Sequence, residues 1–452
     1  MRGSEPQMRV LIIGAGNTGL QLGARLSALH HEVVIVDNGR EGVERARESL
    51  DALVIEGWGA APRVLDEAGI RESNLVAAVT GSDEVNILAC AYAAAVGVGH
   101  KIARVRNTDY FEGWPGEGLR GMGVDRVVCD VEVTAKEIRN VLRLPGTVEV
   151  AELLGGRLIV VGIRVRSGSP LAGRRLEELP RFGEPSQKFR LVGVVRGDEA
   201  FVPHGRTLVT TGDVVYLAVN TRDVDEVLDW VQPSRRRGSR VIIVGGGAVG
   251  RRLAALLQPE MEVVLVERDR TRAERCSAEC RGVTVVHGDC LEEETLREAA
   301  PDDQTGFAAV TGDDENNIIA CLLARRLGIG LTVARISRQH YSPVISTLEI
   351  VDRVVNDHSA LLNAIMGYVR GGHVRASRSL DGFPGEILEI AVEKKSRWEG
   401  RRLESAALPQ GAIVAALQRG EEIIIPTGQT RLTAGDVMVI FSSPEAVARI
   451  RP

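Results

Sequence analysis

The sequence lacks three features, and each absence excludes a class of protein. It contains no run of about 18 uncharged apolar residues, so no membrane-spanning helix is expected. Its six cysteines include no CxxC pair, which argues against a zinc knuckle, and no disulfide framework is expected in a cytosolic chain. The sequence also lacks a large excess of charge of either sign. The net charge of −5 gives no electrostatic case for nucleic-acid binding, so no nucleic-acid partner is expected.

One group of potential metal ligands needs separate consideration. Cys276, Cys280, His287 and Cys290 lie close together in the sequence. However, Cys276 and Cys280 fall within a helical pattern, and Cys290 aligns with Gly59 of an earlier, similar segment. We therefore expect buried or half-buried thiols at these positions and no metal site.

Length and composition indicate a soluble protein of several domains. At 452 residues the chain exceeds what one core supports, and about three or four domains are expected. Apolar residues make up 44% and charged residues 26%, as is typical of soluble globular proteins. Residues 1–7 carry charge and no apolar core, which does not fit a secretory signal, so we expect a cytoplasmic location.

A glycine fingerprint occurs twice in the chain. Residues 10–19 read VLIIGAGNTG and residues 241–250 read VIIVGGGAVG, so that all three glycines superpose at an offset of 231 residues. Each copy follows a short apolar run and opens an amphipathic stretch, which is the strand–turn–helix context of a dinucleotide-binding loop. A single fingerprint is weak evidence, whereas two in one chain indicate that a nucleotide is sensed rather than consumed.

The similarity between the two halves extends beyond the glycines. Residues 32–37 (EVVIVD) match residues 262–267 (EVVLVE) at an offset of 230. Residues 80–86 (TGSDEVN) match residues 311–317 (TGDDENN) at an offset of 231. A register kept over so many residues indicates an internal duplication.

Both halves have the pattern of an α/β fold. Apolar runs such as residues 10–13 suit strands buried on both faces of a parallel sheet, and stretches such as residues 19–29 suit crossover helices. The expected fold class is therefore α/β, with two Rossmann-like doubly wound parallel-sheet domains, each followed by a small α+β domain. The expected domains span 8–130, 148–232, 239–358 and 374–452, with a polar linker at 233–239.

The glycine loops supply the first candidate binding residues. Gly14 allows a tight turn, Gly16 allows the backbone to approach a pyrophosphate, and Gly19 allows close contact between helix and strand. The remaining predicted loop residues are Ala15, Asn17 and Thr18 in the first copy and Gly245, Gly247, Ala248, Val249 and Gly250 in the second.

An acidic residue ends the second strand of each unit. Asp37 stands about twenty residues beyond the first fingerprint, where a carboxylate can accept hydrogen bonds from ribose hydroxyls. Its charge would repel a 2′-phosphate, so NAD(H) is favoured over NADP(H). Glu267 takes the same place in the second half, although Arg268 follows it directly.

Three further pairs of residues are predicted near the ligand. Thr80, with Gly81, and Thr311 stand at the carboxyl ends of strands, on the ligand edge of the sheet. Asn86 and Asn317 lie one turn inside the following, otherwise apolar helices. Arg104 and Arg335 end the next strands, where two roles are open: contact with a phosphate, or a salt bridge to a neighbouring carboxylate.

Together these motifs resemble the RCK (regulator of K+ conductance) family, over nearly the whole chain. The segments that carry the resemblance are residues 14–19 with Asp37, 78–86, 103–106, 287–290 and 307–317.

The resemblance implies a peripheral cytoplasmic regulatory subunit of a K+ uptake system, at the inner face of the cell membrane. The implied partner is an integral membrane K+ transporter subunit of the TrkH/TrkG type, and self-association into a ring-like homo-oligomer is implied as well. NAD(H), or ATP or ADP as in related proteins, would occupy the Rossmann clefts and shift the populations of two conformations. By the same resemblance, Asp289 and Cys290 join the predicted site.

The first half departs from the family pattern in one loop. The family has Gly-Asp after the third strand, as at Gly288 and Asp289, whereas the first half has Gly57, Trp58 and Gly59. The loss of a carboxylate and the gain of a flat ring predict two unequal sites.

Two other functions compete with this interpretation. One is an NAD-dependent oxidoreductase, which would need a proton donor beside the nicotinamide. None of the eight histidines repeats between the halves, and the small domains look unsuited to a substrate, so we expect no enzyme. The other is a nucleotide sensor that acts on a partner other than a transporter.

Overall fold

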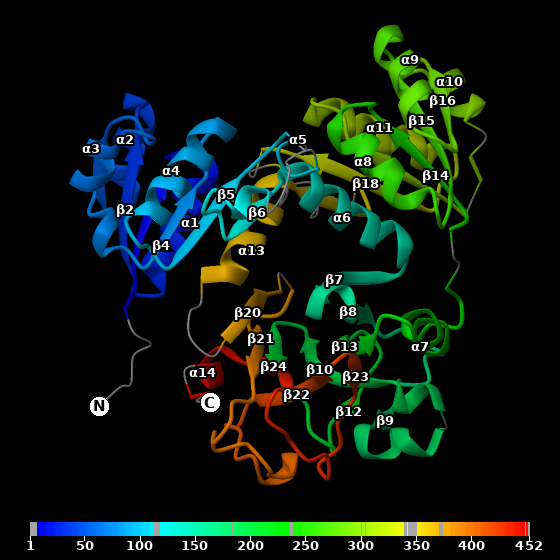
Figure 1. The fold of residues 1–452 in the computed structure, drawn as a ribbon. Coiled ribbons are helices and arrows are strands. Elements are labelled where there is room, and N and C mark those ends of the chain that lie inside the picture. The colour runs from blue at the N-terminus through cyan, green and yellow to red at the C-terminus, as the bar shows by residue number, and fades with distance from the viewer. Residues whose placement is uncertain are drawn as a thin grey trace.

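The computed structural model describes residues 7–450 apart from 108, 113–117, 183, 236–237, 300, 303, 339–340, 342–349, 370–373, 381 and 448. Figure 1 shows two α/β units side by side above a pair of smaller sheets. The predicted fold class is confirmed, since both upper units are built on parallel sheets and the smaller sheets are antiparallel.

The first parallel sheet has the strand order of a Rossmann fold. Its apolar runs are short and continuous because helices cover both faces, and Val10 to Ile13 are fully buried. In spatial order the strands are β3 (Leu53–Glu56), β2 (Glu32–Asp37), β1 (Arg9–Ile13), β4 (Leu75–Ala78), β5 (His100–Arg104) and β6 (Arg126–Val128). Its own helices include α1 (Asn17–Ala28), α2 (Arg40–Ser49), α3 (Pro62–Glu67) and α4 (Asp83–Ala95).

The second parallel sheet repeats this order. Its strands are β16 (Val283–His287), β15 (Glu262–Glu267), β14 (Arg240–Val244), β17 (Thr305–Ala309), β18 (Leu331–Ile336) and β19 (Arg353–Asn356). The corresponding helices are α8 (Ala248–Leu257), α9 (Arg270–Glu279), α10 (Glu293–Glu298) and α11 (Asp314–Arg326).

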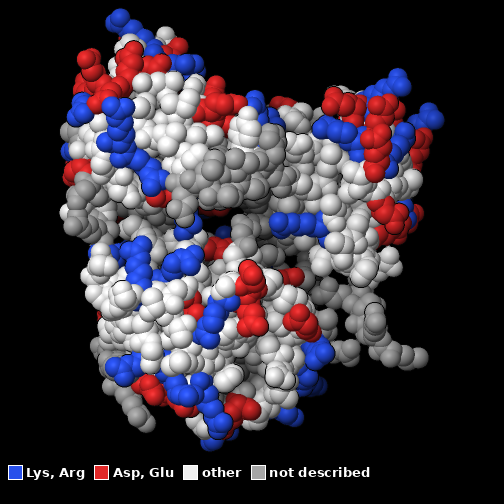
Figure 2. All heavy atoms as spheres, turned by 180° about the vertical axis from the view of Figure 1, so that it is seen from behind, with Lys and Arg blue, Asp and Glu red and all other residues white. Residues whose placement is uncertain are grey.

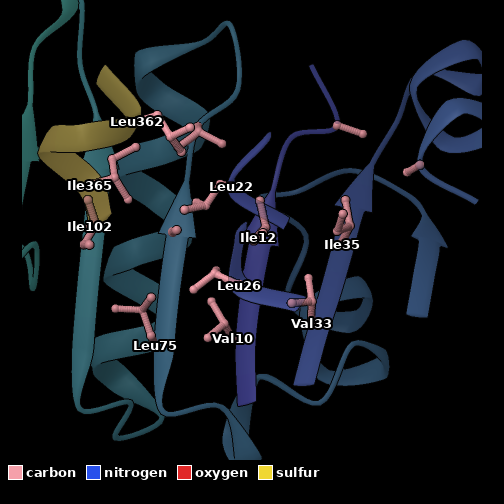
Figure 3. Close-up of a cluster of buried hydrophobic side chains, with 14 of the residues drawn as sticks. Val10, Ile12, Leu22, Leu26, Val33, Ile35, Leu75, Ile102, Leu362 and Ile365 are labelled. Carbon is pink, nitrogen blue, oxygen red and sulfur yellow. The ribbon is translucent and has the colours of Figure 1, made fainter. Parts of the chain in front are cut away.

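The two halves exchange one helix each. Helix α6 (Asp130–Arg143) follows the first sheet, yet its residues Ala135, Ile138 and Leu142 join the core over the second sheet. Helix α13 (Asp357–Val369) follows the second sheet and covers the first one. Figure 3 shows Leu362 and Ile365 of α13 among the side chains of Leu22 and Ile102. The two Rossmann-like units are therefore joined through a shared core.

The small sheets pack against each other as well. One contains β11 (Glu199–Phe201), β10 (Phe189–Arg196), β13 (Val214–Asn220), β8 (Leu158–Arg164) and β7 (Thr147–Leu153). The other contains β20 (Val374–Ser379), β21 (Glu386–Ala391), β24 (Val437–Ser442), β22 (Ala412–Arg419) and β23 (Glu422–Ile424). Tyr216, Phe383 and Phe441 meet in the buried cluster between them, with 5.7 Å between the ring centres of Tyr216 and Phe383. Helix α7 (Val224–Val231) covers the outer face of the first small sheet.

The predicted linker is partly fixed in place. Arg235 forms ion pairs with Asp225 and Asp229, each at 3.0 Å, and its side chain is buried. Arg236 and Arg237, which were also assigned to the linker, lie outside the described residues.

The surface carries charges of both signs. On the face seen in Figure 2, acidic and basic side chains lie intermixed rather than in a continuous basic stripe. Within the described part of the chain, no helix combines the length and the apolar character needed to cross a membrane.

Candidate functional site

The backbone of each glycine loop admits only glycine at two positions. Gly14 has φ +111° and a Cβ there would lie 3.0 Å from the backbone nitrogen of Thr80. A Cβ on Gly19 would lie 1.8 Å from the carbonyl oxygen of Gly14, and one on Gly250 would meet that of Gly245 at the same distance. The sharp turn between strand and helix therefore depends on these residues in both halves.

The middle glycine of each loop faces open space. A Cβ on Gly16 or on Gly247 would find no heavy atom within 4 Å. Each of these glycines is the N-cap of a helix, makes no side-chain capping bond and is followed by a first turn without acidic residues. The N–H groups at such a helix end, together with the helix dipole, favour an anion.

A cleft opens at each glycine loop. The first has a volume of about 430 Å³ and the second about 660 Å³, within the usual range for small-molecule sites. Predicted residues that line the first cleft are Gly14, Gly16, Asn17, Thr18, Asp37, Thr80, Gly81 and Arg104. Those that line the second are Gly245, Gly247, Ala248, Val249, Glu267, Asp289, Cys290, Thr311 and Arg335.

The acidic residues lie where the sequence predicted, at the carboxyl ends of β2 and β15. The carboxylate of Asp37 accepts hydrogen bonds from the backbone N–H groups of Ala15 and Gly39. Glu267 accepts in the same way from Gly246 at 2.7 Å and from Asp269 at 2.9 Å. Each carboxylate thus holds the glycine loop and also lines the cleft.

The two strand-end arginines each form one of the predicted alternatives, a salt bridge to a carboxylate, and also line the clefts. Arg104 lines the first cleft and pairs with Asp130 at the start of α6, with Nε 2.9 Å from the carboxylate. Arg335 lines the second cleft and pairs with Asp357 at the start of α13, at 2.6 Å. Burial disfavours the charged form of Arg335, but the hydrogen bonds and charge of Asp357 outweigh this effect and raise the pKa of Arg335.

Five predicted residues lie beneath the clefts rather than in their walls. Ala15, Gly19 and Gly250 are buried in the turns. The side chain of Asn86 is fully buried, accepts from the backbone N–H of Thr80 at 2.9 Å and donates to the carbonyl oxygen of Arg104 at 2.9 Å. Asn317 makes the same bonds to Thr311 and Arg335. In its own half, each asparagine therefore connects the ends of two neighbouring strands that line the cleft.

The clefts differ in the loop after the third strand. Trp58 lines the first cleft with 53% of its surface exposed, whereas Asp289 and Cys290 line the second. Burial, followed by the charge of Asp289, raises the pKa of the Cys290 thiol to about 11. No group of three or more His, Cys, Asp or Glu side chains that could hold a metal ion is found among the described residues.

Sequence reasoning missed one wall of the first cleft. His358, the second residue of α13, lines this cleft although it belongs to the second half. Its Nδ1 lies 3.3 Å from Oγ1 of Thr18, across 340 residues of sequence. The sequence offers no local signal for this contact, because it depends on the exchange of α13. Arg268 and Arg272 of the second cleft were likewise not predicted as binding residues.

Solved structures share this architecture. The RCK domain of GsuK aligns with a TM-score of 0.61 at 20% identity, covering 98% of this chain and 94% of that chain. The GsuK channel bound to NAD aligns with the same TM-score and identity, covering 98% of this chain and 78% of that chain. At this identity the likeness concerns the fold.

Sequence comparisons identify the family. The TrkA-N domain matches residues 10–130 and 241–357, and the TrkA-C domain matches residues 160–232 and 387–452. The Trk system potassium uptake protein TrkA of Halomonas elongata is 30% identical over 438 residues, which cover 96% of this chain and 95% of that protein. The TrkA homolog 1 of Methanosarcina mazei is 30% identical over 452 residues, which cover 98% and 99%. With two glycine-loop clefts and tandem TrkA-N and TrkA-C domains, this chain belongs to the Trk system potassium uptake protein TrkA family.

Proposed function

We propose that this chain is the peripheral regulatory subunit of a K+ uptake system and that it responds to a nucleotide. NAD(H) is the proposed ligand of the clefts, with ATP and ADP as the alternatives. The proposed partner is an integral membrane K+ transporter subunit of the TrkH/TrkG type, approached from the cytoplasmic face. The relatives named above are potassium uptake proteins of Trk systems, which supports this assignment.

The observation that carries the proposal is the pairing of an anion site with a ribose site in both clefts. The open backbone at Gly16 and Gly247 suits a pyrophosphate at a helix N-terminus. Asp37 and Glu267 stand where ribose hydroxyls are bound in dinucleotide folds, and their charge disfavours a 2′-phosphate. The GsuK channel, which has the same fold, has been solved with NAD.

The structure suggests how a ligand acts at a distance. Arg104 lines the first cleft and is paired with the first residue of α6, which packs on the other half. Arg335 connects the second cleft to α13 in the same manner. A ligand that binds one arrangement of these helices more tightly shifts the population toward it. The regulatory domains proposed are 8–130, 148–232, 239–358 and 374–452, with α6 and α13 joining the two larger ones.

We propose a regulatory rather than a catalytic role. His358 contacts the phosphate turn at Thr18, where a pyrophosphate is expected, rather than a position assigned to the nicotinamide. Incubation of the purified protein with NADH and small carbonyl substrates is therefore expected to give no steady oxidation. Sustained turnover would favour the oxidoreductase instead.

Self-association is proposed through one helix of each half. Leu88 on α4 and Ile319 on α11 are 54% and 45% exposed and occupy equivalent positions of the duplication. Leu322 lies one turn further along α11 and is 44% exposed. Exposed apolar side chains at matching positions suit contacts between copies in a ring. Replacement of Leu88 and Ile319 by Glu is expected to lower the mass measured by light scattering.

Calorimetric titration tests the ligand assignment. NAD+, NADH, ATP and ADP are titrated into the wild type, Asp37→Asn and Glu267→Gln. Each variant is expected to lose one binding phase, because its amide replaces an oxygen acceptor with a donor at the proposed ribose contact. Binding unchanged in both variants would refute the ribose contacts. Co-purification with the membrane subunit, and ligand-dependent K+ flux in proteoliposomes that contain both, test the partner.

A further inference from the structure

The first cleft has a wall that comes from the other half of the chain. His358 is half-buried and lines this cleft together with Gly16 and Thr18 of the phosphate turn. Its Nδ1 lies 3.3 Å from Oγ1 of Thr18, the second residue of α1. The imidazole therefore stands beside the N–H groups that would bind a pyrophosphate.

The second half holds this imidazole in place. The backbone N–H of His358 donates to the side-chain oxygen of Asn356 at 3.1 Å. The preceding residue, Asp357, is paired with Arg335 of the second cleft at 2.6 Å. Leu362 and Ile365 of the same helix are buried against the first sheet. The position of His358 thus depends on packing against the first sheet and on an ion pair with an arginine of the second cleft.

The duplication provides a natural comparison. Asp130 opens α6 as Asp357 opens α13, and both pair with a strand-end arginine. The next residue is His358 in α13 but Val131 in α6, where the side chain packs against the core of the second sheet. The two clefts are therefore unequal at this position.

We propose that the first cleft is a composite site, in which His358 of the second half donates a hydrogen bond to a phosphate of the bound dinucleotide. The inference rests on the proposed function, since it takes a nucleotide with a pyrophosphate as the ligand. Its consequence is that ligand binding in the first cleft ties the two halves together through α13. At the corresponding position of the duplication α6 has Val131, which packs against the core of the second sheet and is not among the residues that line the second cleft.

The charges around His358 make this contact depend on pH. Burial lowers the pKa of His358, and Arg104 and Arg106 lower it further, while Asp357 and Asp130 act in the opposite direction. The first turn of α1 brings no acidic residue. A phosphate beside the imidazole raises its pKa, so binding takes up a proton. Affinity is then highest at low pH and falls as the pH rises through the pKa of the complex.

The test uses NAD+ and the full-length protein. Binding is followed by calorimetry and by the fluorescence of Trp58, which lines the first cleft, with Trp58→Phe to identify its signal. His358→Gln is expected to weaken binding in the first cleft roughly tenfold, the usual scale for one hydrogen bond to a charged group, and to flatten its pH dependence. Val131→Ala, the matched control, is expected to leave binding in both clefts unchanged.

A second variant separates ligand contact from structural support. His358→Arg keeps a charged donor at all pH values, so it is expected to retain affinity and lose the pH dependence. If the wild type binds NAD+ with a Trp58 signal while His358→Gln shows the same affinity and pH profile, the composite site is refuted and the proposed function stands. If the wild type binds none of the four nucleotides, the proposed function fails as well.

Discussion

The hydroxyl of Thr134 donates a hydrogen bond to the carboxylate of Asp357 at 3.2 Å, across 223 residues of sequence. Thr134 lies on α6 and Asp357 on α13, so the bond joins the two exchanged helices. Because Asp357 also pairs with Arg335, the second cleft, α13 and α6 are connected through one carboxylate. Coupling between the halves therefore has a short physical route.

This route can be measured by a double-mutant cycle. Asp357→Asn is expected to lower the free energy of unfolding by about 1–3 kcal/mol, because Arg335 loses its charged partner. Combined with Thr134→Val it is expected to give a coupling energy of about 0.5 kcal/mol or more in urea unfolding. Asp51→Asn, at an exposed position, serves as the control. Strict additivity of the Thr134 and Asp357 variants would contradict a shared network.

The helix exchange predicts where core mutations act. Ile365→Ala removes a fully buried side chain of α13 and is expected to cost about 2–5 kcal/mol. Because Ile365 packs on the first sheet, hydrogen exchange is expected to rise in β1 and β5, although the mutation lies in the second half. Conversely, Ile138→Ala in the first half is expected to raise hydrogen exchange in β14 and β18 of the second sheet. Leu208→Ala, on a side chain that is 43% exposed, is the control. Faster exchange confined to the mutated half would speak against the exchanged helices.

The glycine loop allows folding and binding to be separated. Gly16→Ala places its Cβ in open space and at an extended backbone, so the free energy of unfolding is expected to stay within about 0.5 kcal/mol. The same methyl group occupies the approach of the pyrophosphate, so nucleotide affinity in the first cleft is expected to fall at least tenfold by calorimetry.

Gly19→Ala is the matched comparison in the same loop. Its Cβ would lie 1.8 Å from the carbonyl oxygen of Gly14, so the backbone must move, and about 1–3 kcal/mol of stability should be lost. Equal stability losses in Gly16→Ala and Gly19→Ala would contradict the assignment of Gly16 to ligand binding and of Gly19 to the folding of the turn.

One hydrogen-bonded carboxylate in each small domain, Asp213 and Asp436, predicts that the protein loses stability in acid. Burial alone would raise the pKa of Asp213, but the hydrogen bonds from Arg196 and Thr210 outweigh it and lower the pKa below its ordinary value. A lowered carboxyl pKa adds stability above the unfolded value of about 3.9, which is lost as the pH falls through the folded pKa. Asp436 is held in the same way by Arg419 and Thr433.

Unfolding by urea across this pH range provides the measurement. Asp213→Asn is expected to lower stability at pH 7 by about 1–2 kcal/mol and to flatten the decline below pH 4. Asp198→Asn, at an exposed position of the same domain, is expected to follow the wild type. If the stability of Asp213→Asn declines in acid as steeply as that of the wild type, the decline is due to other groups.

Many local features of this protein can be predicted from sequence patterns that span only a few residues. The buried strands, the glycine turns and the acid at each second-strand end are dictated by apolar runs and by backbone sterics, which act within a few residues. For the same reason the duplication could be recognised from motif spacing alone. Arg104 was expected to meet either a phosphate or a carboxylate, and local pattern could not decide, because its partner Asp130 is 26 residues away.

The remaining features arise from packing between distant segments. Nothing in the sequence near Asn86 distinguishes a ligand contact from the buried bridge between Thr80 and Arg104 that the fold creates. The exchange of α6 and α13 depends on which apolar face finds which sheet, a choice made by the summed burial of many side chains. That choice alone carries His358 across 340 residues to Thr18, and so adds a difference between two clefts that already differ at Trp58 and Asp289.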